Sequence, residues 1–77
     1  MTNFDLWLSP LLDFYPHEAL IYRDYIRPNR HGTFSVYDQR EATERLGVSV
    51  RYLYKVRDRL EALAKIYEVL VETGVIQ

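Results

Sequence analysis

The sequence predicts an all-α domain, with room for one short strand, that is built around a long C-terminal helix. Three observations favour this fold. Apolar residues recur at spacings of three and four over most of the chain, proline and glycine stand where helices are expected to begin and end, and one stretch, residues 33–37, alternates in the manner of a strand. With 77 residues the chain makes one domain, 1–77.

The composition is typical of a globular protein with a small core. Apolar residues make up 48% of the chain and aromatic residues 14%, which is unlike a disordered segment. A chain this short buries only about 60% of the surface that its unfolded form exposes, so such domains often need disulfides, a metal or a partner chain. The chain has no cysteine and only two histidines, which disfavours a metal site. We therefore expect a partner chain or unusually good packing.

Residues 1–15 form an apolar arm. Within the arm, Ser9 and Pro10 are the residue types expected at the cap and at the first position of a helix. We therefore expect a short helix over residues 10–14.

Pro16 is expected to open a second helix from residue 17 to about residue 26, because the apolar residues there recur at helical spacing. Pro28 should end this helix, since the residue before a proline avoids the helical region. After a turn-rich loop, residues 33–37 are expected to form one short strand or a connecting segment that fills the core.

Two further helices are expected on either side of a turn at Gly47. Asp38 is a suitable N-cap for the first, with Glu41 at the spacing of a capping box. This helix should run to residue 46 and end at Gly47, where a positive φ is needed. Ser49 is expected to cap the second helix.

From residue 50 the chain predicts one helix that runs to about residue 73. Its apolar stripe alternates spacings of three and four residues, and consists of Leu53, Val56, Leu60, Leu63, Tyr67 and Leu70. Such a helix is roughly 36 Å long, more than a small monomer can cover. Residues 66–71 are also rich in β-branched types, so a helix over 50–64 followed by a hairpin over 66–77 is the alternative. The continuous stripe favours the single helix.

The charges are unevenly distributed, although the net charge is only −1. Residues 23–59 hold nine basic side chains against five acidic ones, whereas residues 1–22 and 60–77 are acidic. A basic middle between acidic ends is expected of a small protein that binds a polyanion with one face. An ordinary solvated surface is the alternative interpretation.

Residues 39–58, QREATERLGVSVRYLYKVRD, resemble the helix-turn-helix of transcriptional regulators and of replication and phage control proteins. Gly47 stands at the turn, and Thr43 lies where the two helices touch, a position at which the family more often has alanine. The residues expected to point into the domain are all apolar, and these are Ala42, Leu46, Val48, Leu53 and Val56. On this basis residues 38–59 are assigned to the motif.

The resemblance implies sequence-specific binding of double-stranded DNA, with the second helix in the major groove. If Leu53 and Val56 face inward, helical geometry turns Arg51, Tyr54 and Lys55 outward. Arg51 is expected to read guanine, while Lys55 and Tyr54 are expected to contact a base or a phosphate. The full set of residues expected at DNA is Ser49, Val50, Arg51, Tyr54, Lys55, Arg45, Arg57, Arg59 and Arg30, the last in a basic loop with Arg27 and His31.

The order of elements also resembles winged-helix proteins, but a normal wing is missing or shrunken. What this resemblance implies is regulation of transcription or replication, usually by a symmetric homodimer. We expect residues 60–76 and the apolar arm to build a two-fold interface, with Trp7, Leu63, Tyr67 and Leu70 as its apolar residues. Packing of the arm on the long helix within one chain is the alternative.

Other classes of function are less favoured. An enzyme is not expected, because no nucleophile–base pair, phosphate-binding loop or pair of carboxylates in a cleft can be assembled. No cofactor, metal or small-molecule ligand is indicated. The serious alternative is a protein-interaction module, such as an adaptor or antirepressor, that uses the same helices without DNA.

The sequence gives no indication of export or of a membrane. Asp5 precedes any basic residue, and no apolar run reaches the roughly 18 residues needed to span a bilayer. We expect a cytoplasmic protein that is associated with the nucleoid if it binds DNA.

Overall fold

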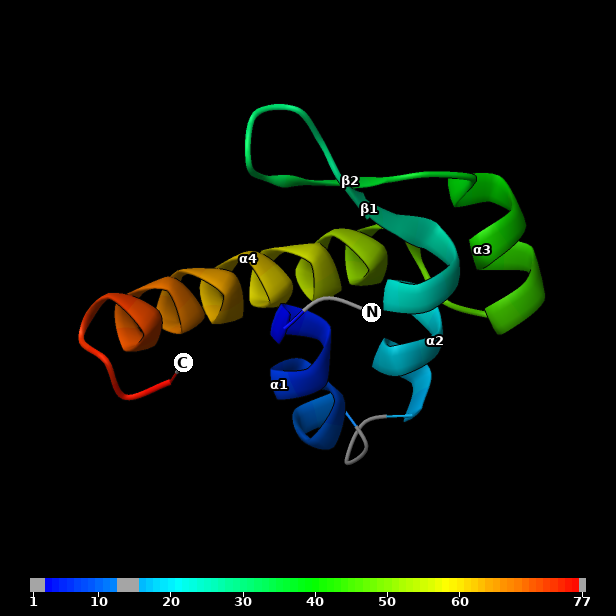
Figure 1. The fold of residues 1–77 in the computed structure, drawn as a ribbon. Coiled ribbons are helices and arrows are strands. Elements are labelled where there is room, and N and C mark those ends of the chain that lie inside the picture. The colour runs from blue at the N-terminus through cyan, green and yellow to red at the C-terminus, as the bar shows by residue number, and fades with distance from the viewer. Residues whose placement is uncertain (1–2, 13–15, 77) are drawn as a thin grey trace.

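The computed structural model describes residues 3–12 and 16–76, which form four helices and two strands (Figure 1). Helices α1 (Asn3–Leu12) and α2 (Pro16–Tyr25) come first, strands β1 (Ile26–Pro28) and β2 (Phe34–Val36) follow, and helices α3 (Gln39–Leu46) and α4 (Val50–Glu72) complete the chain. The protein is mainly helical, as the sequence predicts. The prediction of at most one strand is wrong, because the strands pair as a small sheet.

The long helix α4 is the spine of the molecule (Figure 1). Helices α1, α2 and α3 and strand β2 all pack against it, and its last turns extend beyond them. The molecule is elongated for this reason, with extents of 42 × 27 × 20 Å. One end of α4 therefore lies within the body of the domain and the other projects from it.

The core lies between the first half of α4 and the other elements. Every described helix and strand contributes to it. The buried apolar residues are Leu8, Leu12, Ile21, Tyr25, Ile26, Phe34, Ala42, Leu53, Val56 and Leu60. Burial of one such side chain stabilises the fold by about 1.5–3 kcal/mol. The first half of the predicted apolar stripe of α4 is confirmed as core.

Helix α1 differs from the helix expected over residues 10–14. It begins at Asn3, and Pro10 lies inside it instead of opening it. The reason is burial, because Leu8 and Leu12 are four residues apart and both face the core. Because proline has no N–H, the helical hydrogen bond that would start from residue 10 is missing. Residues 13–15, on which the rest of the predicted helix falls, lie outside the described residues.

Helix α1 is also tied to α2 by a polar contact. The hydroxyl of Tyr22 donates a hydrogen bond to Asp5 Oδ1 at 2.5 Å. Burial, followed by this hydrogen bond, raises the pKa of Tyr22 above the usual value for tyrosine. The contact therefore favours the protonated phenol in the folded state.

Strands β1 and β2 pair antiparallel, with Ile26 opposite Val36, Arg27 opposite Ser35 and Pro28 opposite Phe34. The strand expected within residues 33–37 is confirmed. Its partner β1 was not predicted. The helix expected to end at about residue 26 ends at Tyr25, and the chain continues as a strand from Ile26. The Tyr25 carbonyl accepts a hydrogen bond from Tyr37 N at 2.7 Å, so the chain turns into the hairpin there.

The turn between α3 and α4 forms as predicted. Gly47 has a φ of 66°, which favours glycine, and its N–H donates to the carbonyl oxygen of Thr43 at 3.0 Å. Ser49 Oγ accepts a hydrogen bond from Tyr52 N at 3.1 Å and caps α4. Asp38 does not cap α3 with its side chain, contrary to prediction, because its backbone is left-handed with a φ of 51°.

Helix α4 is continuous to Glu72, so the alternative of a hairpin over residues 66–77 is wrong. After the helix, Val75 N and Ile76 N both donate to the carbonyl oxygen of Leu70, at 2.9 and 3.2 Å. These bonds close the C-terminal end of the helix. In the described part of the chain, no helix has the length and apolar character to cross a membrane.

Candidate nucleic-acid interface

The first turns of α4 present a basic surface because two of their apolar side chains are fixed inside. Leu53 and Val56 are completely buried and Ala42 of α3 packs into the same core. With 3.6 residues per turn, Arg51 and Lys55 must then point away from the core, and both are exposed. The outward direction expected for these two side chains is confirmed.

A shallow hollow of about 640 Å³ lies on this part of α4. Its lining residues are Ser49, Arg51, Tyr52, Tyr54, Lys55 and Asp58. Among the described residues, neither Arg51 nor Lys55 forms an ion pair. The hollow thus combines two cations, and two tyrosine side chains, with one carboxylate, Asp58, which is itself paired with Arg57. This lining suits a polyanion.

Tyr54 is held in place from two sides. Gln39 Nε2, at the start of α3, donates a hydrogen bond to the Tyr54 hydroxyl at 2.5 Å. The guanidinium of Arg57 lies over the Tyr54 ring, 4.9 Å from its centroid. Tyr54 is therefore oriented before any ligand arrives, and Gln39 is a site residue that the sequence did not indicate.

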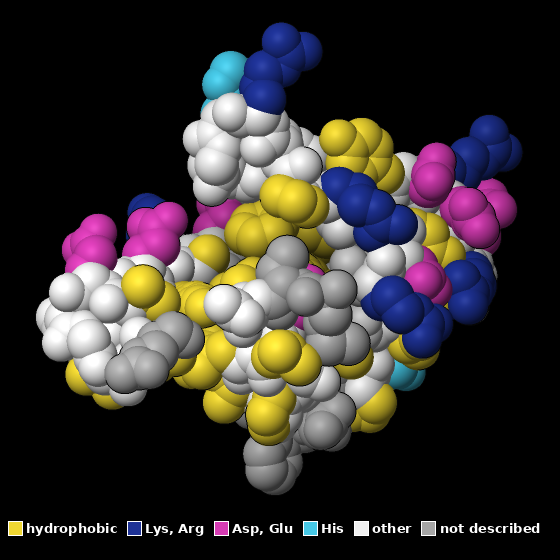
Figure 2. All heavy atoms as spheres, in the orientation of Figure 1, with side chains coloured by type: hydrophobic (Ala, Val, Ile, Leu, Met, Phe, Trp, Pro, Cys, Tyr) yellow, Lys and Arg dark blue, Asp and Glu magenta, His cyan; other side chains and the backbone are white. Residues whose placement is uncertain are grey.

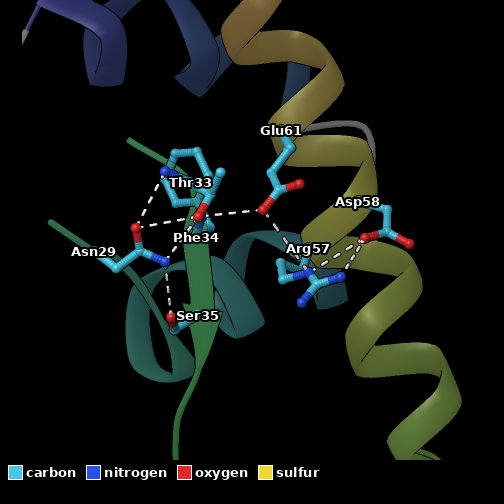
Figure 3. A network of polar contacts seen from close by, with 7 residues as sticks. All are labelled: Asn29, Thr33, Phe34, Ser35, Arg57, Asp58 and Glu61. Carbon is cyan, nitrogen blue, oxygen red and sulfur yellow. Dashed lines mark hydrogen bonds and ion pairs between the residues drawn. The ribbon is translucent and has the colours of Figure 1, made fainter. Parts of the chain in front are cut away.

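Arg57 is bound within the chain and does not line the hollow. Its Nη2 lies 2.7 Å from Asp58 Oδ1 and its Nε lies 3.9 Å from Glu61 Oε1 (Figure 3). The hydrogen bond to Asp58 is the main reason that the pKa of Arg57 is raised above its usual value. The structure thus places this predicted phosphate contact beside Tyr54, on the flank of the hollow.

Arg59 and Arg45 also have partners within the chain. Arg59 Nη1 lies 2.6 Å from Oε1 of Glu18, a carboxylate that is largely buried, and joins α4 to α2. Arg45 Nη1 lies 3.2 Å from the Tyr25 hydroxyl and 3.3 Å from Asp24 Oδ2. The Tyr25 hydroxyl, and then Asp24, raise the pKa of Arg45. Neither arginine lines the hollow.

The remaining residues that were predicted to contact DNA lie at the edge of the hollow or apart from the hollow. Val50 is exposed at the first position of α4, beside Ser49. Arg30 is exposed in the loop between β1 and β2, next to His31. Figure 2 shows a basic side chain and a histidine standing out from the body at this loop. The predicted residues therefore divide into a group on α4 and one on the hairpin.

The aromatic residues assigned to a dimer interface are stacked within one chain. The rings of Trp7 and Tyr67 lie 5.4 Å apart between centroids, and Phe4 stacks on both. Leu63 is half-buried and packs against the core. The alternative, in which the arm packs on the long helix, is thus what the structure shows for these residues.

At the projecting end of α4, the exposed apolar side chains differ from those named for the dimer interface. Ile66 and Val69 are 50% and 56% exposed, and Val71 and Val75 are exposed as well. These residues lie within the segment 60–76 that the sequence analysis expects at a two-fold interface, although the four residues named for that interface are Trp7, Leu63, Tyr67 and Leu70.

No residue combination for a metal is evident, since no three His, Cys, Asp or Glu side chains of residues 3–12 and 16–76 lie close enough to hold an ion.

The chain matches no family model, no curated protein and no solved structure.

Proposed function

We propose that the protein binds double-stranded DNA in a sequence-specific manner through the first turns of α4, as a small regulator of transcription or replication. The observation that carries this proposal is the exposure of Arg51 and Lys55, without ion-pair partners in the described chain, on a helix whose opposite side is fully buried. An α-helix with such a face fits the major groove of B-DNA.

The side chains of the hollow differ in what they offer to a duplex. Arg51 presents a planar fork of donors, which suits the O6 and N7 atoms of guanine. Lys55, one turn later, presents a compact charge that suits either a base or a phosphate. Tyr54 is already oriented by Gln39 and Arg57, so little side-chain entropy is lost when it contacts a thymine methyl group or a phosphate.

The start of α4 supports a contact to the backbone of the same duplex. Backbone N–H groups in the first turn of a helix point out of its end, where the helix dipole favours a negative charge. Ser49 fixes this end by capping it, and Val50 is exposed there. We therefore assign Ser49 and Val50 to the phosphates that border the groove, which position α4 without reading sequence.

The experiment that tests this proposal compares two arginine variants on a duplex selected from a random library at fixed salt. Arg51→Ala should weaken binding by about 5- to 150-fold, which corresponds to the 1–3 kcal/mol of a bidentate base contact. Arg23→Ala is the control, because it removes an exposed arginine of α2 that lies outside the hollow and pairs with Asp24. Binding is measured by fluorescence anisotropy.

Two results contradict the proposal. One is a wild-type protein that selects no duplex even at low salt. The other is an equal effect of Arg51→Ala and Arg23→Ala, which would mean that only overall charge matters.

A protein-interaction module is the second candidate, and the exposed apolar side chains of α4 favour it. Ile66, Val69 and Val75 lie at the projecting end, away from the basic hollow. Salt dependence separates the two candidates, because DNA binding weakens with a log–log slope of about −0.9 per phosphate contacted. A nearly flat salt dependence with a protein ligand would favour the interaction module.

A further inference from the structure

A hydrogen bond joins the β1–β2 hairpin to α4, in addition to the packing of Phe34 in the core. The backbone N–H of Phe34 donates a hydrogen bond to Glu61 Oε1 at 3.1 Å (Figure 3). The same carboxylate oxygen lies 3.9 Å from Arg57 Nε, and Arg57 lies over the ring of Tyr54. A continuous series of contacts therefore runs from the hairpin to a side chain of the hollow.

The loop that joins the two strands is held in one shape by Asn29. Its Oδ1 accepts hydrogen bonds from His31 N at 2.9 Å and Thr33 N at 3.2 Å. Its Nδ2 donates to Thr33 Oγ1 at 2.8 Å and to Ser35 Oγ at 3.1 Å, as Figure 3 shows in part. Both polar atoms of the amide are thus used within the loop, which reduces the number of conformations open to it.

This ordered loop displays a cation that has no counter-ion among residues 3–12 and 16–76. Arg30 and His31 are exposed at the tip, and in the described part of the chain Arg30 forms no ion pair. The other arginine of the hairpin behaves differently, because Arg27 Nη1 donates to the carbonyl oxygens of Arg23 and Ile26. A charge on a pre-ordered loop can bind an anion at little entropic cost.

We propose that the β1–β2 hairpin is a second DNA-contacting element, in which Arg30 binds phosphates that flank the major-groove site of α4. The proposal rests on the proposed function. Its new content is the part played by Glu61, which sets the position of the hairpin relative to α4 and so determines how far along the duplex Arg30 reaches. Glu61 is a positioning residue and does not itself touch DNA.

This role gives Glu61 an effect on affinity opposite to that of an ordinary acidic residue. Removing a carboxylate from a DNA-binding surface normally strengthens binding, because a repulsion is lost. Removing Glu61 should weaken binding instead, because Phe34 N loses its acceptor and Arg57 keeps Asp58 alone as an ion-pair partner. Glu68 is the matched control, since it is an exposed glutamate two turns later on the same helix.

The experiment measures the salt dependence of binding for each variant on two duplexes. The first is the duplex selected by the wild-type protein, and the second is the same duplex shortened on the flank that footprinting assigns to the hairpin. On the long duplex, Arg30→Ala should lower the magnitude of the salt slope by about 1. Glu61→Ala should do the same, whereas Glu68→Ala should leave the slope unchanged.

On the shortened duplex, wild-type protein, Arg30→Ala and Glu61→Ala should bind alike, because the phosphates in question are gone. Glu61→Gln should restore the wild-type slope on the long duplex, since its amide oxygen still accepts from Phe34 N. If Glu61→Ala disturbs folding, Glu61→Gln still tests the positioning role, because it retains the acceptor for Phe34 N.

The possible failures are distinguishable. If wild-type protein binds no duplex, the proposed function fails. If wild-type protein binds and Arg51→Ala weakens it, but Arg30→Ala keeps the wild-type slope on both duplexes, only the role of the hairpin is overturned. If Arg30→Ala behaves as expected but Glu61→Ala matches Glu68→Ala, the positioning role of Glu61 is overturned.

Discussion

At the scale of single residues, the buried position of Glu18 shows why a positive charge alone does not assign Arg59 to DNA. Its side chain is the buried charged one in the described core, with one oxygen bound by Arg59 and the other, Oε2, without a hydrogen-bond partner. A buried carboxylate that loses its cation destabilises a protein, because the desolvated charge is left uncompensated. Arg59 therefore has a structural task, whatever else it contacts.

We accordingly expect Arg59→Ala to lower the free energy of unfolding by about 2 kcal/mol, the size of a hydrogen bond to a charged group. Urea denaturation measures this change. Adding Glu18→Gln should recover part of the loss, since the buried group is then neutral. A variant with wild-type stability but weaker DNA binding would mean that Arg59 acts mainly as a phosphate contact.

At the scale of elements, the junction of α1 and α2 depends on a protonated phenol. Burial and the bond to Asp5 raise the pKa of Tyr22 in the folded protein, whereas an unfolded chain has the usual tyrosine pKa of about 10. The contribution of Tyr22 to stability is thus fully present below pH of about 10 and is lost as the pH rises above that value.

The prediction for this junction concerns alkaline conditions. Above a pH of about 10, the free energy of unfolding should fall more steeply for the wild-type protein than for Tyr22→Phe, which has no proton to lose. Chemical denaturation in a pH series measures both slopes. Equal slopes would show that the Tyr22–Asp5 contact does not favour the protonated phenol.

The elements also show which features a sequence pattern can predict. Gly47, Ser49 and the stripe through Leu53 and Val56 were predicted correctly, because each depends on residues within a turn or two. The start of α1 and the strand at Ile26 were missed, because contacts between distant segments decide them. Helix α1 includes Leu8 because that side chain is buried in the core, and Ile26 is in a strand because it pairs with Val36 of β2.

The candidate site divides in the same way. The outward direction of Arg51 and Lys55 follows from helical geometry once Leu53 is inside. Whether an arginine is available for a ligand does not follow, because Arg59 is bound by a glutamate 41 positions away in the chain. The contact of Gln39 with Tyr54 could not be predicted from the sequence either, since it depends on how α3 crosses α4.

At the scale of the whole molecule, opposite ends of α4 carry different kinds of surface. The first turns are basic, and the projecting end combines the exposed apolar side chains of Ile66 and Val69 with the acidic one of Glu72. Figure 2 shows apolar and acidic side chains at this end. We propose that a second copy of the chain binds at this end, which leaves both basic ends available for half-sites about 34 Å apart.

The corresponding prediction replaces one exposed apolar residue. Val69→Lys should shift wild-type dimers to monomers, because a charge at the centre of an apolar interface is costly to desolvate. Analytical ultracentrifugation at micromolar concentration measures the shift. Lys65→Ala, which changes a charge on the same part of the helix, should leave the dimer intact. A wild-type protein that sediments as a monomer would contradict the proposal.

The unbroken course of α4 from Val50 to Glu72 has one more consequence. No hinge separates the turns that face the duplex from those at the opposite tip, so the helix transmits orientation as a stiff rod does. In a paired assembly, the two reading surfaces would keep a fixed separation and a fixed relative rotation. Each extra base pair between half-sites turns the second one by about 35° around the duplex axis, and a rigid rod cannot follow that rotation.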